Sequence, residues 1–171
     1  MAEIFYIELF RAFEKEGLRY LLVGGLAVNL YGVERATMDV DIILAMEGEN
    51  LDRFLRAARS LGLVPVMPVA LESLADEAAR SQWAQEKGMV AFALRTSDPA
   101  APTLDVLIRP QVPFEEAWAR RVEKTVAGLK ICLASVDDLI RMKSATGRLR
   151  DRSDIEALEK ARRLGVIDGK N

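Results

Sequence analysis

The sequence has no histidine and only one cysteine, Cys132, among its 171 residues. The absence of histidine excludes a Ser-His-Asp triad, a histidine general base and a zinc ion held by histidine. One cysteine cannot form an internal disulfide, which favours a cytoplasmic protein. The apolar runs are shorter than the roughly 18 residues of a membrane-spanning helix, and the first residues lack the layout of a secretory signal peptide. We therefore expect a cytoplasmic protein that does not contact a membrane.

Neither sign of charge dominates, since the chain has 24 Lys and Arg residues and 26 Asp and Glu residues, and its net charge is −2. Contact with nucleic acid would therefore require a local basic patch. Hydrophobic residues make up 50% of the chain and charged residues 29%, as in ordinary globular proteins. The length predicts a single domain over 1–171, in which a sheet with helices over 1–133 carries packed C-terminal helices over 134–171.

The hydrophobic periodicity switches repeatedly between helical and strand spacing. Helices are predicted over 3–16, 26–31, 51–61, 71–86, 114–121, 135–146 and 151–164, strands over 20–23, 38–44, 63–66, 89–94 and 103–108, and a hairpin over 125–133. Ser135 and Asp151 are expected to cap the last two helices. The pattern predicts an α+β (α/β mixed) fold, with a mixed sheet flanked by helices and a C-terminal helical tail.

Two aspartates one residue apart, Asp39 and Asp41, stand in the apolar strand predicted over 38–44. A period of two places both carboxylates on one face of a strand, where they repel each other unless a cation lies between them. Mg²⁺ prefers a few carboxylates together with phosphate oxygens. A solvated strand face is the alternative, but aspartate is depleted in strands. The pair therefore favours a metal site.

Gly24 and Gly25 follow the apolar run over 20–23. They can bring backbone N–H groups close to a phosphate at a helix start, although a plain tight turn also explains them. Asp105 stands in the apolar strand over 103–108. If that strand neighbours the one with the aspartate pair, Asp105 joins the metal site and can act as a general base on an acceptor hydroxyl. A position in an edge strand explains it equally well.

Three further polar residues suit the binding of phosphate. Arg35 suits a triphosphate, and Thr37 can donate or accept a hydrogen bond at the turn, although loop structure explains both equally well. Lys143 shares a helical stripe with Val136 and Leu139, so it either binds phosphate or keeps its charged end in water above a buried stem. The run 143–152 is the best candidate for a basic patch, and a solvated surface turn is its alternative.

Together these residues resemble the DNA polymerase β-like nucleotidyltransferase superfamily. The resemblance rests on Gly24-Gly25, on Arg35-x-Thr37-x-Asp39-x-Asp41 and on Asp105. The tail, with Asp138-Leu139-Ile140-Arg141-Met142-Lys143, Gly147-Arg148 and Asp151 to Ile155, resembles the branch of small bacterial enzymes that includes the AbiEii-type toxins and the MNT-type nucleotidyltransferases. The resemblance covers about residues 18 to 160.

The resemblance implies a mixed sheet with three carboxylates, two Mg²⁺ ions and an NTP, from which a nucleoside monophosphate is transferred to a hydroxyl while pyrophosphate leaves. We expect the catalytic and metal-binding residues to be Asp39, Asp41 and Asp105, and the nucleotide-binding residues to be Gly24, Gly25, Arg35, Thr37 and Lys143. Many members have a serine beside the first glycine, where this chain has Gly25. The missing histidine agrees with such chemistry, because two metal ions can stabilise the entering and leaving oxygens.

Three functions stay open at this point. The first is transfer from ATP or another NTP to a protein or RNA acceptor such as tRNA, in a toxin–antitoxin or phage-defence system. The second is transfer to a small hydroxyl compound, as in the aminoglycoside-modifying enzymes. The third is an interaction or antitoxin module with little catalysis that binds a cognate toxin or antitoxin partner. The sequence predicts the first.

Overall fold

The computed structural model describes residues 2–167, in which the strands form one mixed sheet in the order β3-β4-β5-β2-β1-β7-β6. The strands are β1 (Tyr20–Val23), β2 (Val40–Leu44), β3 (Val64–Pro65), β4 (Ala91–Arg95), β5 (Leu104–Leu107), β6 (Val122–Val126) and β7 (Leu129–Leu133). β2 runs antiparallel to β1 and parallel to β5, and β1 runs parallel to β7. The predicted mixed sheet is therefore confirmed.

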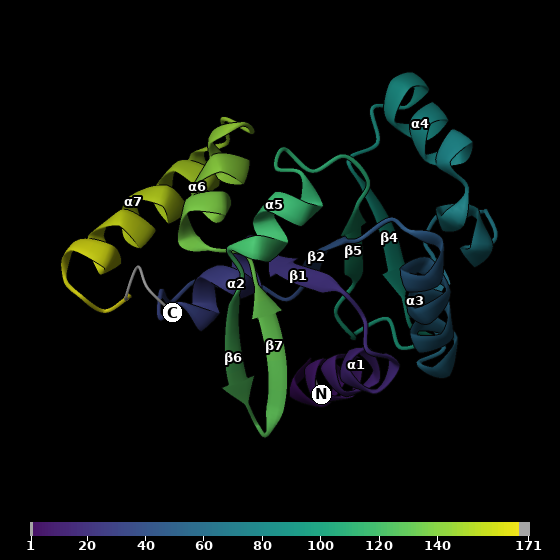
Figure 1. Cartoon of the computed structure of the whole chain (residues 1–171), viewed down its shortest axis with the longest axis horizontal. Helices are drawn as coiled ribbons and strands as arrows, with labels where there is room; N and C mark the ends of the chain where they lie inside the picture. The colour runs from purple at the N-terminus through teal and green to yellow at the C-terminus, as the bar shows by residue number, and fades with distance from the viewer. Residues whose placement is uncertain (1, 168–171) are drawn as a thin grey trace.

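Helices surround this sheet on several sides (Figure 1). They are α1 (Ala2–Glu16), α2 (Gly24–Leu30), α3 (Gly48–Ser60), the 3₁₀ helix η1 (Leu71–Ala75), α4 (Glu77–Glu86), α5 (Phe114–Ala119), α6 (Val136–Ser144) and α7 (Leu149–Arg163). α1 packs against α3 and β7, whereas α6 and α7 pack against each other at the left end of the view (Figure 1). None of the helices within residues 2–167 is long and apolar enough to cross a membrane.

The core forms because the apolar stripe of α1 meets the sheet. Phe5, Leu9 and Phe13 recur every fourth residue and are all buried, as the spacing predicts. The ring of Phe13 lies 4.8 Å from the ring of Tyr20 on β1 and 6.4 Å from that of Phe54 on α3. These aromatic contacts hold α1, β1 and α3 together.

Several predicted elements differ from the structure. The hairpin expected over 125–133 begins earlier, at Val122. The helix expected over 71–86 is interrupted at Asp76, whose extended backbone separates η1 from α4. Its carboxylate accepts hydrogen bonds from the backbone N–H groups of Ala78 and Ala79, so the interruption is the N-cap of α4. The strand expected over 63–66 reduces to β3, an edge strand that ends at Pro65, which has no N–H to donate to a neighbour.

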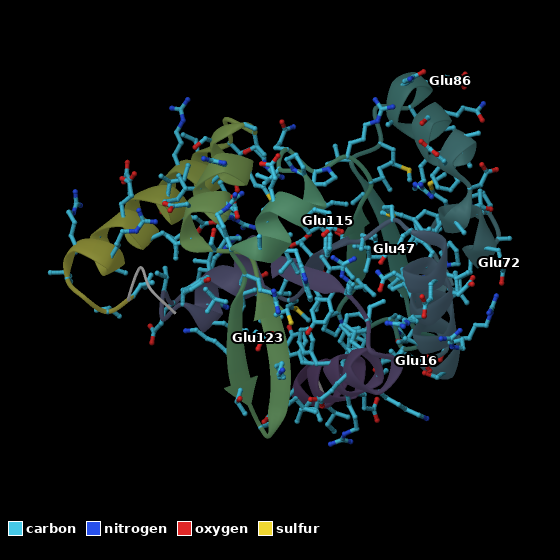
Figure 2. The ribbon with its side chains drawn as sticks, in the orientation of Figure 1. Glu16, Glu47, Glu72, Glu86, Glu115 and Glu123 are labelled. Carbon is cyan, nitrogen blue, oxygen red and sulfur yellow. The ribbon has the colours of Figure 1, made fainter. Side chains whose placement is uncertain are left out.

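Arg19 holds three elements together at the end of β1 that lies opposite Gly24. Its guanidinium pairs with Glu47 before α3 at 2.9 Å and with Glu115 on α5 at 2.7 Å. It also lies over the ring of Trp118, 5.3 Å from the centroid. The two labelled glutamates lie close together in Figure 2. This cluster links the start of β1 to α5 and to the residue before α3.

Candidate active site

Asp41 and Asp105 lie directly opposite each other on the neighbouring parallel strands β2 and β5. The residues on either side of Asp41, Val40 and Ile42, are fully buried and fix the register of the strand pair. β5 lies between β4 and β2, so the interpretation of Asp105 as an edge-strand residue is wrong. The strand of Asp105 therefore neighbours the strand of Asp41, which was the condition for Asp105 to join the aspartate pair.

Asp39 lies immediately before β2, one residue short of the strand expected to contain it. One of its carboxylate oxygens accepts a hydrogen bond of 3.3 Å from the backbone N–H of Thr103. The hydroxyl of Thr103 donates to Asp105 across 3.4 Å, so the residue before β5 links both carboxylates. Among residues 2–167, no three side chains of Asp, Glu, His or Cys are arranged closely enough to hold a metal ion alone. A cation here would need further ligands, such as phosphate oxygens.

The electrostatics of this acidic group favour the binding of a cation. Burial, together with the charges of Asp105 and Asp39, raises the pKa of Asp41 to about 6, while Lys143 and Arg35 oppose the rise. Burial and the charge of Asp39 likewise raise the pKa of Asp105 above its usual range. Carboxylates that resist ionisation because they are buried and lie near one another are stabilised in their charged form by a divalent cation. The donor set therefore fits Mg²⁺.

Gly24 leaves space for the carboxylate of Asp41. A Cβ atom at position 24 would lie 2.1 Å from Oδ2 of Asp41 and 2.8 Å from its Cγ. The backbone φ of Gly24 is +67°, a conformation that residues with side chains rarely adopt. Both observations require glycine at this position, and together they place the turn after β1 against the acidic group.

Gly25 leaves space for two other predicted residues. A Cβ at position 25 would lie 2.7 Å from Nη1 of Arg35 and 2.8 Å from Oγ1 of Thr37. The side chain of a serine would therefore collide with both. The guanidinium of Arg35 and the hydroxyl of Thr37 occupy the space that such a serine would fill, which gives a physical reason for the departure at this position.

Lys143 lies on the inner side of α6, and its side chain is 8% exposed. Its ammonium group donates to Asp154 at 2.8 Å and to Asp151 at 3.4 Å. The same oxygen of Asp154 accepts a 2.8 Å hydrogen bond from Arg35. The helical stripe therefore correctly predicted that Lys143 points inward, while its contact with phosphate stays a prediction.

The structure corrects our interpretation of Asp151 as a helix cap. α7 begins at Leu149, after Arg148, and its first turn has no side-chain cap. Asp151 is instead a buried residue within the first turns of α7. Thr146 and Arg148 also donate hydrogen bonds to its carboxylate. Asp151, Asp154 and Leu158 form the buried stripe of α7. Their spacing of three and four residues was the signal in the sequence that could have identified the two acids as facing inward.

A cavity of about 170 Å³ lies between the glycine turn and α6. Gly24 and Asp41 line one side of it, and Lys143 and Arg148 line another. A wider, open hollow of about 660 Å³ lies over the loop between α2 and β2, and the three aspartates are not among the residues that line it. The smaller cavity therefore brings Asp41, Gly24 and Lys143 together, while Arg35 lines the wider hollow.

Known proteins share this architecture. The lincosamide antibiotic adenylyltransferase LnuA, solved with lincomycin, is 18% identical with a TM-score of 0.56, and the match covers 92% of this chain and 94% of that one. ANT(2″)-Ia, in complex with adenylyl-2″-tobramycin, is 15% identical with a TM-score of 0.59, covering 97% and 93%. An antigenic nucleotidyltransferase-like protein from Paracoccidioides brasiliensis is 20% identical with a TM-score of 0.55, covering 91% and 72%.

These likenesses show a shared fold. No curated protein sequence matches the chain. The model of a protein family described as "Nucleotidyltransferase of unknown function (DUF6036)" matches residues 7–166. The chain therefore belongs to this family, and the protein is a nucleotidyltransferase.

Proposed function

We propose that the protein transfers a nucleoside monophosphate from an NTP, such as ATP, to a hydroxyl group of a protein or RNA in a Mg²⁺-dependent reaction. The observation that carries the proposal is the pairing of Asp41 with Asp105 in adjacent strands, directly beside the turn at Gly24. A carboxylate group next to a glycine turn can hold a metal–phosphate complex. The resemblance of the tail to AbiEii-type toxins supports a role in a toxin–antitoxin or phage-defence system.

The three carboxylates have distinct roles in this proposal. Asp39, Asp41 and Asp105 would hold two Mg²⁺ ions, which neutralise charge on the phosphate and on the entering and leaving oxygens. Asp105 also accepts the proton of the acceptor hydroxyl. For this role Asp105 must be ionised, and bound cations favour the ionised form of a carboxyl.

The triphosphate would lie against the glycine turn. Gly24 lines the cavity there, Gly25 is buried against Arg35 and Thr37 of the loop before β2, and Lys143 reaches the cavity from α6. The hydroxyl of Thr37 would take the role of the missing serine, since it occupies the space beside Gly25. Arg35 and Lys143 supply the positive charge that the phosphate groups require.

The surroundings of the site support a large acceptor. The cavity beside Asp41 measures about 170 Å³, below the roughly 300 to 1,000 Å³ of pockets that enclose drug-sized ligands. The exposed Arg109 and Arg148 stand at its rim, and Arg150 and Arg152 continue the positive charge onto the surface of α7. A polyanion such as RNA would be attracted to this rim although the protein as a whole is slightly acidic.

Transfer to a small hydroxyl compound is the second candidate. It is favoured by the similarity of the fold to LnuA and ANT(2″)-Ia, whose structures contain lincomycin and adenylyl-2″-tobramycin. In that case the acceptor would bind in the small cavity or over its open mouth. The arginines at the rim argue against a polycationic acceptor, because like charges repel.

The experiment that tests the proposal follows binding and transfer separately. Thermal melting with each NTP and Mg²⁺ should show a rise, since a ligand at 100 times its dissociation constant adds about 2.7 kcal/mol. Incubation with α-³²P-labelled NTP should then label RNA or protein from a cell extract. The Asp105→Asn variant should lose the labelling, whereas Asp52→Asn, which alters an exposed carboxylate on α3, should retain it.

The acceptor class follows from where the label is found. Label in RNA or protein that depends on Asp105 supports the proposal. Label only in added hydroxyl compounds, such as lincosamides or aminoglycosides, supports the second candidate instead. A protein that neither melts higher with any NTP nor transfers label would refute both and leave the interaction module as the function.

A further inference from the structure

A buried ion-pair cluster joins α7 to the loop that leads into β2. Asp154 is 5% exposed, and a single oxygen of its carboxylate accepts hydrogen bonds from both Lys143 and Arg35, each at 2.8 Å. These two cations come from α6 and from the loop between α2 and β2. Buried charges are stable only when paired, and Asp154 makes the shorter of the two carboxylate contacts of Lys143 and is the ion-pair partner of Arg35.

Both partners of Asp154 reach the glycine turn. Nη1 of Arg35 would lie 2.7 Å from a Cβ atom at Gly25. Lys143 lines the cavity that Gly24 and Asp41 also line. One carboxylate on α7 therefore holds two cations that approach the same turn from different elements of the fold.

The cluster keeps an excess of positive charge. Arg35, Lys143 and Arg148 contribute three positive charges, and Asp151 and Asp154 contribute two negative ones, so their sum is +1. Asp151 shares its oxygens with a threonine and an arginine of the neighbouring turn as well. Pairing within the cluster therefore orients its cations and leaves one net positive charge, which attracts an anion.

We propose that Asp154 is a positioning residue that sets Arg35 and Lys143 as a matched pair for the triphosphate of the nucleotide. The inference rests on the proposed function, in which both cations bind the triphosphate, and it adds that a carboxylate on α7 prepares this binding site before the nucleotide arrives. Prior orientation reduces the entropy that flexible side chains lose on binding.

The test compares Asp154→Asn with a matched control, Asp138→Asn. Asp138 is also a fully buried carboxylate, paired with Arg120 at 2.8 and 3.0 Å, and it contacts neither Arg35 nor Lys143. The probes are inorganic tripolyphosphate with Mg²⁺ and a non-hydrolysable NTP analogue, with affinities measured by calorimetry. Melting temperatures are recorded for each variant so that lost stability is separated from lost binding.

Asp154→Asn is expected to weaken both probes at least tenfold and to raise KM for the NTP by a similar factor, while kcat changes less than threefold. Asp138→Asn is expected to lower the melting temperature but to keep both affinities within twofold of wild type. Asp154→Glu keeps the charge but displaces it by one methylene, so it should bind at least threefold more weakly than wild type and more tightly than Asp154→Asn. It also serves as the test variant if Asp154→Asn does not fold.

Several results would overturn the positioning role. Wild-type or tighter binding in the Asp154 variants would mean that the carboxylate is idle or competes with phosphate. Equal weakening in Asp138→Asn would mean that only stability matters. A wild-type protein that binds neither probe lacks the phosphate site on which the inference depends.

Tripolyphosphate binding that requires Asp154, in a protein that transfers no nucleotide, would instead refute the proposed function and retain the positioning role.

Discussion

Replacing Asp41 by asparagine should stabilise the protein in the absence of metal while abolishing nucleotide transfer. Burial, then the charges of Asp105 and Asp39, raise the pKa of this carboxyl from 3.8 to about 6. A carboxyl whose pKa is raised by folding stabilises the fold when protonated. That contribution is complete below about pH 3.8 and is lost as the pH rises through about 6. At higher pH the ionised Asp41 therefore destabilises the folded state, and asparagine removes this cost.

The size of the effect follows from the same pKa. A rise from 3.8 to about 6 corresponds to about 3 kcal/mol, and partial exposure of the side chain to water makes this an upper bound. Proteins are stable by only about 5 to 15 kcal/mol, so the gain is large. With urea m-values of about 1 to 3 kcal/mol per M, the unfolding midpoint should rise by about 1 to 3 M.

Urea unfolding at pH 8 and pH 4, with a chelator present, measures this gain. Asp41→Asn should be the more stable protein at pH 8, and the difference should shrink below about 1 kcal/mol at pH 4, where the folded wild type is protonated. Asp52→Asn, an exposed control, should stay within about 0.5 kcal/mol of wild type at both values. Mg²⁺ with an NTP should stabilise the wild type alone. A less stable Asp41→Asn at pH 8, or a difference independent of pH, would refute the reasoning.

Further predictions concern the glycine turn, the buried cluster and the core. Gly24→Ala should destabilise the protein by about 1 to 2 kcal/mol from backbone strain at φ +67° and weaken NTP binding by displacing Asp41, so unchanged melting with NTP would contradict this account. Lys143→Met should lower the free energy of unfolding in urea by about 3 to 5 kcal/mol, and adding Asp154→Asn should restore part of that loss. If the effects of the two substitutions simply added, the result would argue against the pairing. Phe13→Ala should lower the free energy of unfolding by about 3 to 5 kcal/mol yet leave tripolyphosphate affinity intact; a matching loss of affinity would contradict the separation of core and site.

Local chemistry made much of the fold predictable. The four-residue spacing of Phe5, Leu9 and Phe13 predicts a helix with one buried face, and this helix is α1. Ser135 was expected to cap the helix that starts at the next residue, which is α6. Its hydroxyl does accept a hydrogen bond of 3.2 Å from the backbone N–H of Asp138. Such features depend on neighbours a few positions away, so the sequence contains all the information that they require.

The residues of the acidic group could also be predicted from the sequence, but their proximity in space could not. Charged residues in apolar strands single out Asp41 and Asp105, because aspartate is unfavourable there. Whether those strands are neighbours depends on the order of the sheet, which is set by packing over the whole chain. Only the register of β2 with β5 decides that the two carboxylates face each other.

By itself, the sequence determined most of the elements, the glycine turn and the set of chemically suited residues, because each follows from local spacing. The tertiary structure alone decided what surrounds them. Arg35 and Asp154 are 119 positions apart and meet only because α7 packs beside the loop before β2. In the sequence, Gly25 is only a position where related enzymes have a serine. In the fold, the side chains of Arg35 and Thr37 occupy the space that this serine would need. Contacts of this range depend on how whole elements are buried, and no local pattern of residues encodes them.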